Sequence, residues 1–397
     1  MNLRKQKGLE ISKTKTIQSG VDGWIVPSQS GNKNYFVRKN YSCSCPDHKN
    51  RDCTCKHAFA VQYYLQKITI KKGKVKVEAK KLTYPQAWSA YNKSQETEKE
   101  RFMELLKDLL ENIEEPDYNF GRPKISEKDL MFASALKVYS QFSLRRFMSD
   151  LKFAKEKELI QKVPCFASVG HFMQKKQITK TLKQLISKSG IVLKTCEEKF
   201  CIDSTGFRTT KFNEYCKEKH DTKRRHEWLK LHAVCGAKTN IITSCEVSKS
   251  HGTGSGDSPN LIPLAIETKE NGFDIQEFSA DMAYSSRDNL ALIDDFGGTA
   301  YIPFKKSARG IPKGKNHIWR KMFHYFKFNQ DEFMQHYHKR SNIETTFFMI
   351  KSKFNDCLKS KTHTAQKNEL LLKVLCHNIV VVIHETNELG IAVNFKG

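Results

Sequence analysis

Hydrophobic and polar positions change their spacing twice along this chain of 397 residues, and these changes divide it into three parts. Within residues 20–38, two short apolar stretches predict strands on either side of a Ser-Gly-Asn turn. A segment rich in Cys and His follows, and a helix is then predicted from the apolar residues Ala58, Val61, Tyr64 and Leu65. We therefore expect residues 1–75 to form one small module.

Residues 76–190 have the spacing that is typical of helices. A lysine-rich linker leads into residues 85–113, where charged and apolar positions alternate at helical spacing, and EEPDYNFGRP ends that helix. Residues 126–190 are again helical and basic, with short helices and tight joins as in a helix-turn-helix. Such a region either binds DNA or packs as a scaffold, and the pattern alone leaves both open.

From residue 191 onwards, β-branched and apolar runs between turn residues predict strands. The expected order is β-β-β-α-β-α-β, with helices near residues 260–268 and 286–293. After a basic loop, neither Pro nor Gly occurs from Asn316 to Glu388, so this part should be helical. We expect an α/β domain with a mixed sheet over residues 191–397.

The chain has a large excess of basic residues, with 68 Lys and Arg against 43 Asp and Glu and a formal net charge of +25. This excess favours binding to a polyanion, and a solvated basic surface is the alternative. No apolar run approaches the length of a membrane-spanning helix, and no basic amphipathic helix stands out. The first residues, MNLRKQKGLE, lack the apolar stretch of a secretory signal, so we expect an intracellular protein.

Four of the twelve cysteines lie between residues 43 and 55, which favours a metal site in a reducing compartment over disulfides. Tetrahedral zinc requires four soft or borderline ligands, and a module this small would gain its fold from the metal. The candidate ligands are Cys43, Cys45, Cys55 and His57. Cys53 and His48 are rival ligands. The spacing resembles the SWIM zinc finger, which implies one Zn²⁺, strands before the ligands and a helix that contains the His.

Three acids are candidates for a second metal site. Asp203 and Asp281 each follow an apolar strand, and Glu344 lies in the C-terminal helical part. Carboxylates are the usual ligands of Mg²⁺ or Mn²⁺, and two such ions can neutralise a phosphate and position a nucleophile. Taken singly, an Asp at the end of a strand is more often a turn or cap residue.

Glu344 belongs to a Tyr-x2-Arg-x3-Glu-x6-Lys signature whose other members are Tyr337, Arg340 and Lys351. At about 100° per residue, these four side chains fall within roughly 60° of one another around a helix. We therefore expect one helical face that carries an acid among cations and a phenol. The acid suits a divalent metal, and its neighbours suit the phosphate backbone of a nucleic acid.

These motifs resemble those of the DDE transposases, in particular the insertion-sequence group with the Tyr-Arg-Glu-Lys signature, over about residues 120–390. The matching contexts are CIDSTGF, SADMAYSS and YHKRSNIETTFFMIKSKF. The resemblance implies an RNase H-like catalytic domain in which two Mg²⁺ or Mn²⁺ ions are held by Asp203, Asp281 and Glu344. It also implies DNA contacts from Tyr337, Arg340 and Lys351. The family often has Lys where this chain has Met282, which puts a phosphate contact from that position in doubt.

The activity that the resemblance implies is transposition. Water would first free a 3′-hydroxyl at the end of the mobile element, and that hydroxyl would then attack target DNA. Double-stranded DNA would be the partner, a homodimer would join two ends in a synaptic complex, and the location would be cytoplasmic and nucleoid-associated. The alternatives are a metal-dependent nuclease that does not join ends and a catalytically inactive, zinc-containing DNA-binding protein.

Two further polar residues favour structural interpretations. Asp257 precedes Ser258 and Pro259 at the start of a predicted helix, and this pattern is typical of a helix N-cap with proline in the first turn. His232 lies in a predicted strand, where a core or surface histidine is favoured over a site residue. The Gly-rich segment before Asp257 lacks Gly-Lys-Ser/Thr, so a nucleotide-triphosphate loop is not expected.

Overall fold

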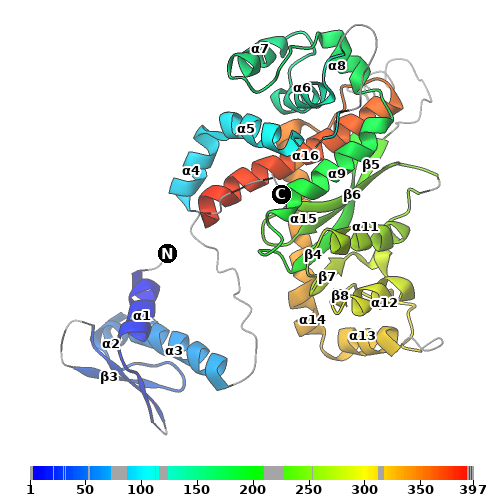
Figure 1. Cartoon of the computed structure of the whole chain (residues 1–397). Helices are drawn as coiled ribbons and strands as arrows, with labels where there is room; N and C mark the ends of the chain where they lie inside the picture. Colours follow the sequence, from blue (N-terminus) through cyan, green and yellow to red (C-terminus); the bar gives the residue numbers. More distant parts are fainter. Residues whose placement is uncertain are drawn as a thin grey trace, which may run out of the picture. The chain divides into compact units, whose positions relative to one another are not determined.

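The chain folds into two compact units in the computed structural model, an N-terminal unit of Met1–Pro85 and a C-terminal unit of Gln86–Gly397 (Figure 1). The structure describes residues 3–20, 22–29, 31, 33–51, 54–72, 87–111, 113–115, 124–209, 228–252, 254–311, 317–390, 393 and 395, with only the backbone at 65–72. Within these ranges, no helix has the length and apolar character needed to cross a membrane.

The N-terminal unit packs helices against a small antiparallel sheet. The strands, in sheet order, are β1 (Gln18–Ser19), β2 (Gly23–Pro27) and β3 (Asn34–Arg38), and β2 and β3 confirm the strands expected in this part of the sequence. The helices are α1 (Leu3–Thr14), α2 (Pro46–Arg51) and α3 (Lys56–Lys72). Helices α1 and α3 approach closely at Gly8, where an added Cβ would lie 2.7 Å from the Cβ of Phe59. The small core therefore depends on a glycine at this position.

A five-stranded mixed sheet forms the centre of the C-terminal unit. In sequence order its strands are β4 (Lys199–Arg208), β5 (Trp228–Gly236), β6 (Ile242–Lys249), β7 (Glu277–Ala280) and β8 (Thr299–Tyr301). The spatial order is β6-β5-β4-β7-β8; β4 is antiparallel to β5 and parallel to β7. With α11 (Ser258–Glu270) and α12 (Arg287–Asp295) between the later strands, the expected β-β-β-α-β-α-β order is confirmed.

Helices cover both faces of this sheet because its strands are apolar on both sides. Along β4, Cys201 and Phe207 belong to the core on one face, and Phe200 and Ile202 belong to the core on the other. The first face is covered by α9 (Gln177–Ile191), α15 (Ser341–Phe354) and α16 (His363–Leu389), and the second by α11, α12 and α14 (Gln330–Tyr337) (Figure 1). The sheet is thus the middle of three layers.

The helical region before the sheet packs onto α16. Its helices are α4 (Trp88–Glu96), α5 (Glu98–Leu110), α6 (Glu127–Ser140), α7 (Met148–Glu156) and α8 (Phe166–Phe172), followed by α9. One hydrophobic core runs from α5 and α6 through α16 to the sheet. The helical region and the sheet therefore form a single compact unit, and a DNA-binding role for residues 76–190 stays a prediction.

A side chain of α16 closes one edge of the sheet. Asn378, which is fully buried, accepts a hydrogen bond from the backbone nitrogen of Ile242 at 3.0 Å and donates one to its backbone oxygen at 2.8 Å. Ile242 begins the edge strand β6. The amide of Asn378 takes the place of a peptide group in a neighbouring strand, and it also donates to the hydroxyl oxygen of Ser189 on α9 at 3.0 Å.

Candidate active site and metal centre

Asp203 and Asp281 lie at neighbouring positions on two parallel strands. The last residue pair in the β4–β7 register is Ile202 with Ala280, and each aspartate is the next residue along its own segment. The expectation that β4 ends at Asp203 is wrong, because the strand continues to Arg208 in antiparallel pairing with β5. Asp203 nevertheless marks the end of pairing with β7, and this places the two acids next to each other where β4 and β7 stop pairing.

Arg340 connects Asp203 to Glu344. Its Nη2 lies 3.1 Å from Asp203 Oδ2, and its Nη1 lies 2.7 Å from Glu344 Oε1. Burial raises the pKa of Asp203, the backbone N–H of Ser204 and the charge of Arg340 oppose that rise, and the charge of Asp281 adds to it. Two of the three predicted acids are therefore joined by one guanidinium, and the third is their electrostatic neighbour.

The four signature residues do not lie on one helix, contrary to the simple helical projection. Tyr337 is the last residue of α14, Arg340 ends a 3-10 turn, η2 (His338–Arg340), and Glu344 lies in the first turn of α15. The turn is held by two contacts: Lys339 Nζ lies 2.9 Å from a Glu277 carboxylate oxygen, and the Cys201 thiol donates to the backbone oxygen of Lys339. These long-range contacts direct Arg340 towards β4.

Tyr337 and Lys351 complete the surroundings of the acids. The pKa of Tyr337 is raised, chiefly by burial, and the charges of Asp281 and Asp203 contribute while Arg340 opposes them. Lys351 Nζ donates a hydrogen bond of 2.6 Å to Thr205 Oγ1, two residues beyond Asp203, and burial lowers the pKa of this lysine. All six predicted residues thus lie around the part of β4 from Asp203 to Thr205 and around the end of β7.

Asp281 also has a local structural role. Its side chain accepts a hydrogen bond of 2.6 Å from the backbone nitrogen of Met282 and caps the 3-10 turn η1 (Met282–Tyr284). Met282 itself is exposed and offers no cation at this position. The cap fixes the carboxylate of Asp281 where the chain leaves β7. A role as a cap residue and a role as a site residue are therefore compatible for Asp281.

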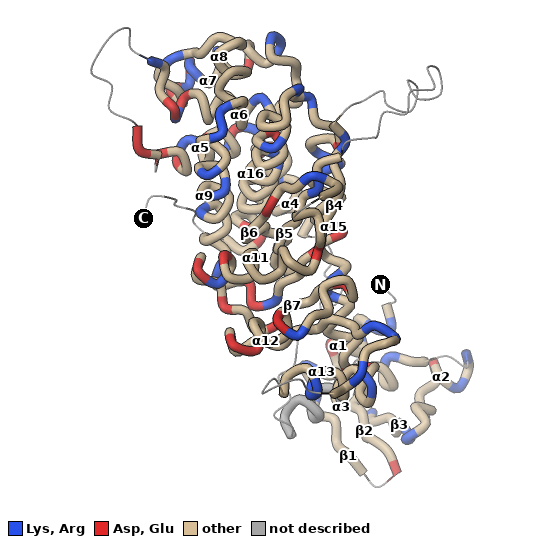
Figure 2. The backbone as a smooth tube through the Cα atoms, turned by 90° about the vertical axis from the view of Figure 1, so that its right-hand side faces the viewer, with Lys and Arg blue, Asp and Glu red and all other residues tan. Residues whose placement is uncertain are grey.

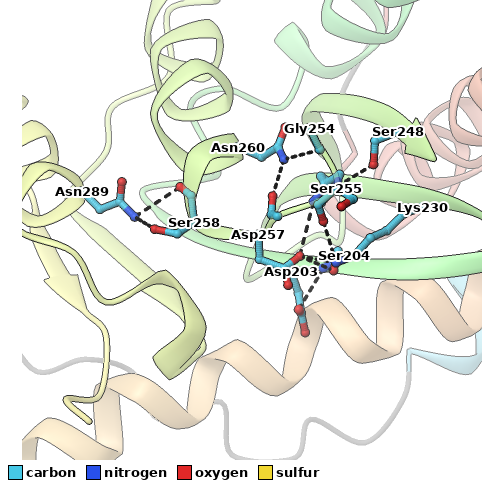
Figure 3. Close-up of polar contacts among 12 residues, drawn as sticks. Asp203, Ser204, Lys230, Ser248, Gly254, Ser255, Asp257, Ser258, Asn260 and Asn289 are labelled. Atoms are coloured by element: carbon cyan, nitrogen blue, oxygen red, sulfur yellow. Dashed lines mark hydrogen bonds and ion pairs between the residues drawn. The ribbon is translucent and has the colours of Figure 1, made fainter. Parts of the chain in front are cut away.

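Asp257 lies close to Asp203, with Ser204 bonded to both, and the sequence did not predict this arrangement (Figure 3). Asp257 occupies the expected N-cap position of α11, but its side chain makes no capping hydrogen bond. Its Oδ1 instead accepts a hydrogen bond from Ser204 Oγ at 2.8 Å and lies 2.7 Å from Lys230 Nζ. His232 is completely buried, with Nδ1 at 3.5 Å from the same oxygen. No local signal predicts these contacts, because they join three separate elements.

The acids suit hard divalent cations by their chemistry, since carboxylate oxygens are the ligands that Mg²⁺ and Mn²⁺ prefer. Within the described ranges, however, only the Cys/His cluster brings at least three potential metal-ligating side chains close together. The guanidinium of Arg340 lies between Asp203 and Glu344, pairs with both and offsets part of their negative charge. A metal ion bound by both acids would therefore replace this guanidinium.

The predicted zinc ligands converge in the N-terminal unit. The ligand atoms of the four residues all lie within 4.8 Å of one another, and all four side chains are buried. The residues are Cys43, Cys45, Cys55 and His57. Cys43 pairs with Val37 of β3 in an isolated bridge, and His57 lies in the first turn of α3. His48 of α2 is outside the cluster, and Cys53 lies outside the described residues.

The electrostatics of this cluster fit a cation. A hydrogen bond with Cys43 is the main cause that lowers the pKa of Cys55, and the same bond raises the pKa of Cys43. The buried thiols therefore compete for negative charge. The Nε2 atom of His57 is buried with no hydrogen-bond partner in the described part of the chain. A zinc ion would remove the competition between thiolates, so the residues present fit a tetrahedral zinc site.

Comparison with known proteins supports a DDE transposase domain. Residues 194–379, a little under half of the chain, match the family model described as "Transposase DDE domain". This range contains all three acids and the whole Tyr-Arg-Glu-Lys signature. Among solved structures, the chain resembles one described as "Cryo-EM structure of piggyBac transposase synaptic complex with hairpin DNA", with 11% identity, a TM-score of 0.35 and coverage of 74% of each chain. A similarity at that TM-score assigns no role to individual residues.

Proposed function

We propose that the protein is a DNA transposase. It binds the ends of its mobile element, hydrolyses a phosphodiester bond there and transfers the 3′-hydroxyl end to target DNA with two divalent metal ions, Mg²⁺ or Mn²⁺. The observation that supports this proposal is the pairing of Arg340 with both Asp203 and Glu344, next to Asp281 and inside the segment that matches the transposase domain. The sheet order, with the first two acids on its adjacent parallel strands, supports an RNase H-like catalytic domain.

The proposed roles follow from side-chain chemistry. Asp203, Asp281 and Glu344 hold the metal ions, which would activate the attacking oxygen and stabilise charge on the phosphate. Arg340 has a planar guanidinium that can donate two parallel hydrogen bonds to a phosphate once it leaves the carboxylates. Tyr337 and Lys351 lie on either side of Glu344 in the sequence, and they would bind the DNA beside the scissile bond.

The N-terminal unit is proposed to be a SWIM-type zinc finger that binds one Zn²⁺. Strands precede its ligands and a helix contains His57, as that type of finger requires. Together with the helical region it would bind element ends, or it would bind another protein. Lys and Arg are distributed over many elements, whereas Asp and Glu are frequent around α11 and α12 (Figure 2). Double-stranded DNA is the proposed partner, and a homodimer would hold two ends in the synaptic complex.

An assay of strand transfer tests the enzymatic proposal. The sequence that flanks the gene should contain terminal inverted repeats, and a pre-cut oligonucleotide of that sequence serves as substrate with Mg²⁺ and a supercoiled target. We expect joined products from the wild-type protein and none from D203N, D281N or E344Q. D295N is the matched control, because Asp295 is an exposed acid at the end of α12.

Each alternative has its own outcome. Nicking of an uncut end without any joined product would favour a metal-dependent nuclease. Unchanged transposition by the three acid variants in a two-plasmid assay would show that the protein is not a DDE enzyme and would favour the zinc-containing DNA-binding protein.

A further inference from the structure

A fourth carboxylate lies beside the proposed catalytic acids and comes from a different element. Ser204 connects it to Asp203: the backbone N–H of Ser204 donates to Asp203 Oδ1 at 2.8 Å, and its hydroxyl donates to Asp257 Oδ1 at 2.8 Å (Figure 3). One residue of β4 therefore orients two carboxylates, one from β4 and one from the start of α11. The charge of Asp257 also adds to the elevation of the Asp203 pKa, so the two acids are electrostatic neighbours.

The contacts of Asp257 leave one of its oxygens available. Ser204 Oγ, Lys230 Nζ and His232 Nδ1 all approach Oδ1, at 2.8, 2.7 and 3.5 Å. Oδ2 accepts no hydrogen bond from any residue that the structure describes. Lys230 is itself held by a second contact, a hydrogen bond of 3.2 Å to the backbone oxygen of Ser255. Asp257 is thus oriented through one oxygen and can offer the other to a ligand.

Two buried polar atoms next to Asp257 lack hydrogen-bond partners. His232 Nε2 is paired with Ser248 Oγ at 3.0 Å, but its Nδ1 has no hydrogen-bond partner among the described residues. The hydroxyl of Tyr284 is likewise buried and unpaired within those residues. Burial raises the pKa of Tyr284 most, and among charged groups Asp257 and then Asp203 contribute the largest further increases. Unpaired buried polar atoms are rare, so their presence on the Asp257 side of the site indicates a bound ligand or its water there.

Asp257 is also in the ionic form that a metal ligand needs. Burial acts to raise its pKa, but hydrogen bonds from Lys230 and Ser204 outweigh burial and hold the pKa below its ordinary value. The carboxylate therefore carries its negative charge at neutral pH. Lys230 neutralises it in the same way that Arg340 neutralises Asp203 and Glu344.

We propose that Asp257 is a fourth acidic residue of the catalytic site, which helps to hold a divalent cation beside Asp203, and that Lys230 takes the place of that cation in the metal-free protein. This inference rests on the proposed function. The competing explanation is an ion pair that only fastens α11 to β5. That explanation gives no reason for Oδ2 to accept no hydrogen bond, or for His232 Nδ1 and the Tyr284 hydroxyl to be buried without a hydrogen-bond partner among the described residues.

Calorimetric titration with Mn²⁺ tests the inference on the full-length, zinc-loaded protein. We expect D257N to weaken Mn²⁺ binding by about tenfold or more, as loss of a carboxylate from the coordination of a hard cation should. We expect K230M to strengthen Mn²⁺ binding, because the competing ammonium group is gone. The matched control is D274N: Asp274 is an exposed acid paired with Lys269, and its loss should leave the affinity unchanged.

A double variant separates ligation from general electrostatics. If Asp257 holds the cation, the gain from K230M should disappear in the D257N background. Wild-type Mn²⁺ affinity in D257N, or an equal gain from K230M with and without Asp257, would overturn the inference. If D257N does not fold, as judged by circular dichroism, an unchanged Mn²⁺ affinity in K230M alone would overturn it. Failure of the underlying function is recognised separately, because D203N would then bind Mn²⁺ as well as the wild-type protein.

Discussion

Replacement of Arg340 with Met should destabilise the C-terminal unit when no Mg²⁺ or Mn²⁺ is present and have little effect when Mn²⁺ saturates the site. Arg340 pairs with Asp203 and Glu344, and its own side chain is only 16% exposed. Without the guanidinium, Asp203 keeps its charge in a largely buried position near Asp281. A bound cation would supply the missing positive charge.

The expected cost can be worked out from the two ion pairs. The Glu344 side chain is 63% exposed, so its pair contributes at most about 1 kcal/mol. Asp203 is 20% exposed, and breaking a buried pair costs about 3–5 kcal/mol. Protonation limits this cost, because protonating a carboxyl of ordinary pKa at pH 7 requires about 4 kcal/mol. We therefore expect a loss of about 2–4 kcal/mol in the free energy of unfolding at pH 7.

The cost should also depend on pH. Burial raises the pKa of folded Asp203, and Arg340 opposes that rise, so its removal raises the pKa further. A carboxyl whose pKa is higher in the folded state favours folding at low pH, and this contribution is lost as the pH rises. The destabilisation by R340M should be absent below about pH 4, the pKa of Asp in unfolded chains, and should grow as the pH rises through the folded pKa.

Urea unfolding, followed by tryptophan fluorescence in buffer that contains zinc, measures these effects with and without Mn²⁺. The matched control is R208M. Arg208 lies on β4, as Asp203 does, and its ion pair with Asp356 is more exposed. R208M should cost at most about 1 kcal/mol, with the same value in both buffers. If R340M loses equal stability with Mn²⁺, without Mn²⁺ and at pH 5, Arg340 acts by packing and the electrostatic argument is refuted.

Three further predictions concern the zinc site, the edge strand β6 and the contact between α1 and α3. C55S should reduce bound zinc from about one ion per chain to none and unfold the N-terminal unit, as metal analysis and limited proteolysis would detect; a folded, zinc-free variant would contradict this. N378A should lower the free energy of unfolding by about 2–4 kcal/mol because it leaves backbone groups of β6 unpaired. The control N387A on the same helix should cost under about 1 kcal/mol, because among the described residues Asn387 bonds only to the backbone of its own helix. G8A should destabilise the N-terminal unit by about 1–3 kcal/mol, because the added Cβ would contact Phe59 and this outweighs the helix preference of Ala. Chemical unfolding measures this change, and a more stable variant would show that α1 can shift at no cost.

Elements whose own residues determine their structure were predictable from the sequence. The apolar strands around Asp203 and Asp281, and the helices between later strands, occur in the expected order, since both faces of the sheet are buried and the strands are correspondingly apolar. The absence of Pro and Gly correctly predicted a largely helical segment before Glu388. The helix α15 nevertheless ends before Asn355, which adopts a φ of +67° although it is not a glycine.

Features that depend on distant contacts were not predictable. The 3-10 turn that separates Tyr337 from Glu344 is held by Glu277 and Cys201, neither of which is near it in sequence. Asp257 has the local pattern of a cap, but Ser204 and Lys230 engage its side chain from two strands. Sequence spacing therefore indicated which acids to consider, whereas the neighbours that orient them come from tertiary structure.

The amide of Asn378 also constrains how two copies of this chain could assemble. A strand edge with free N–H and C=O groups is a site where another chain can add by edge-to-edge pairing. At Ile242 both backbone groups are already engaged, and α9 and α16 pack against β6. A second copy could not pair with β6 at Ile242 without displacing the Asn378 side chain, so edge-to-edge pairing at this position is blocked.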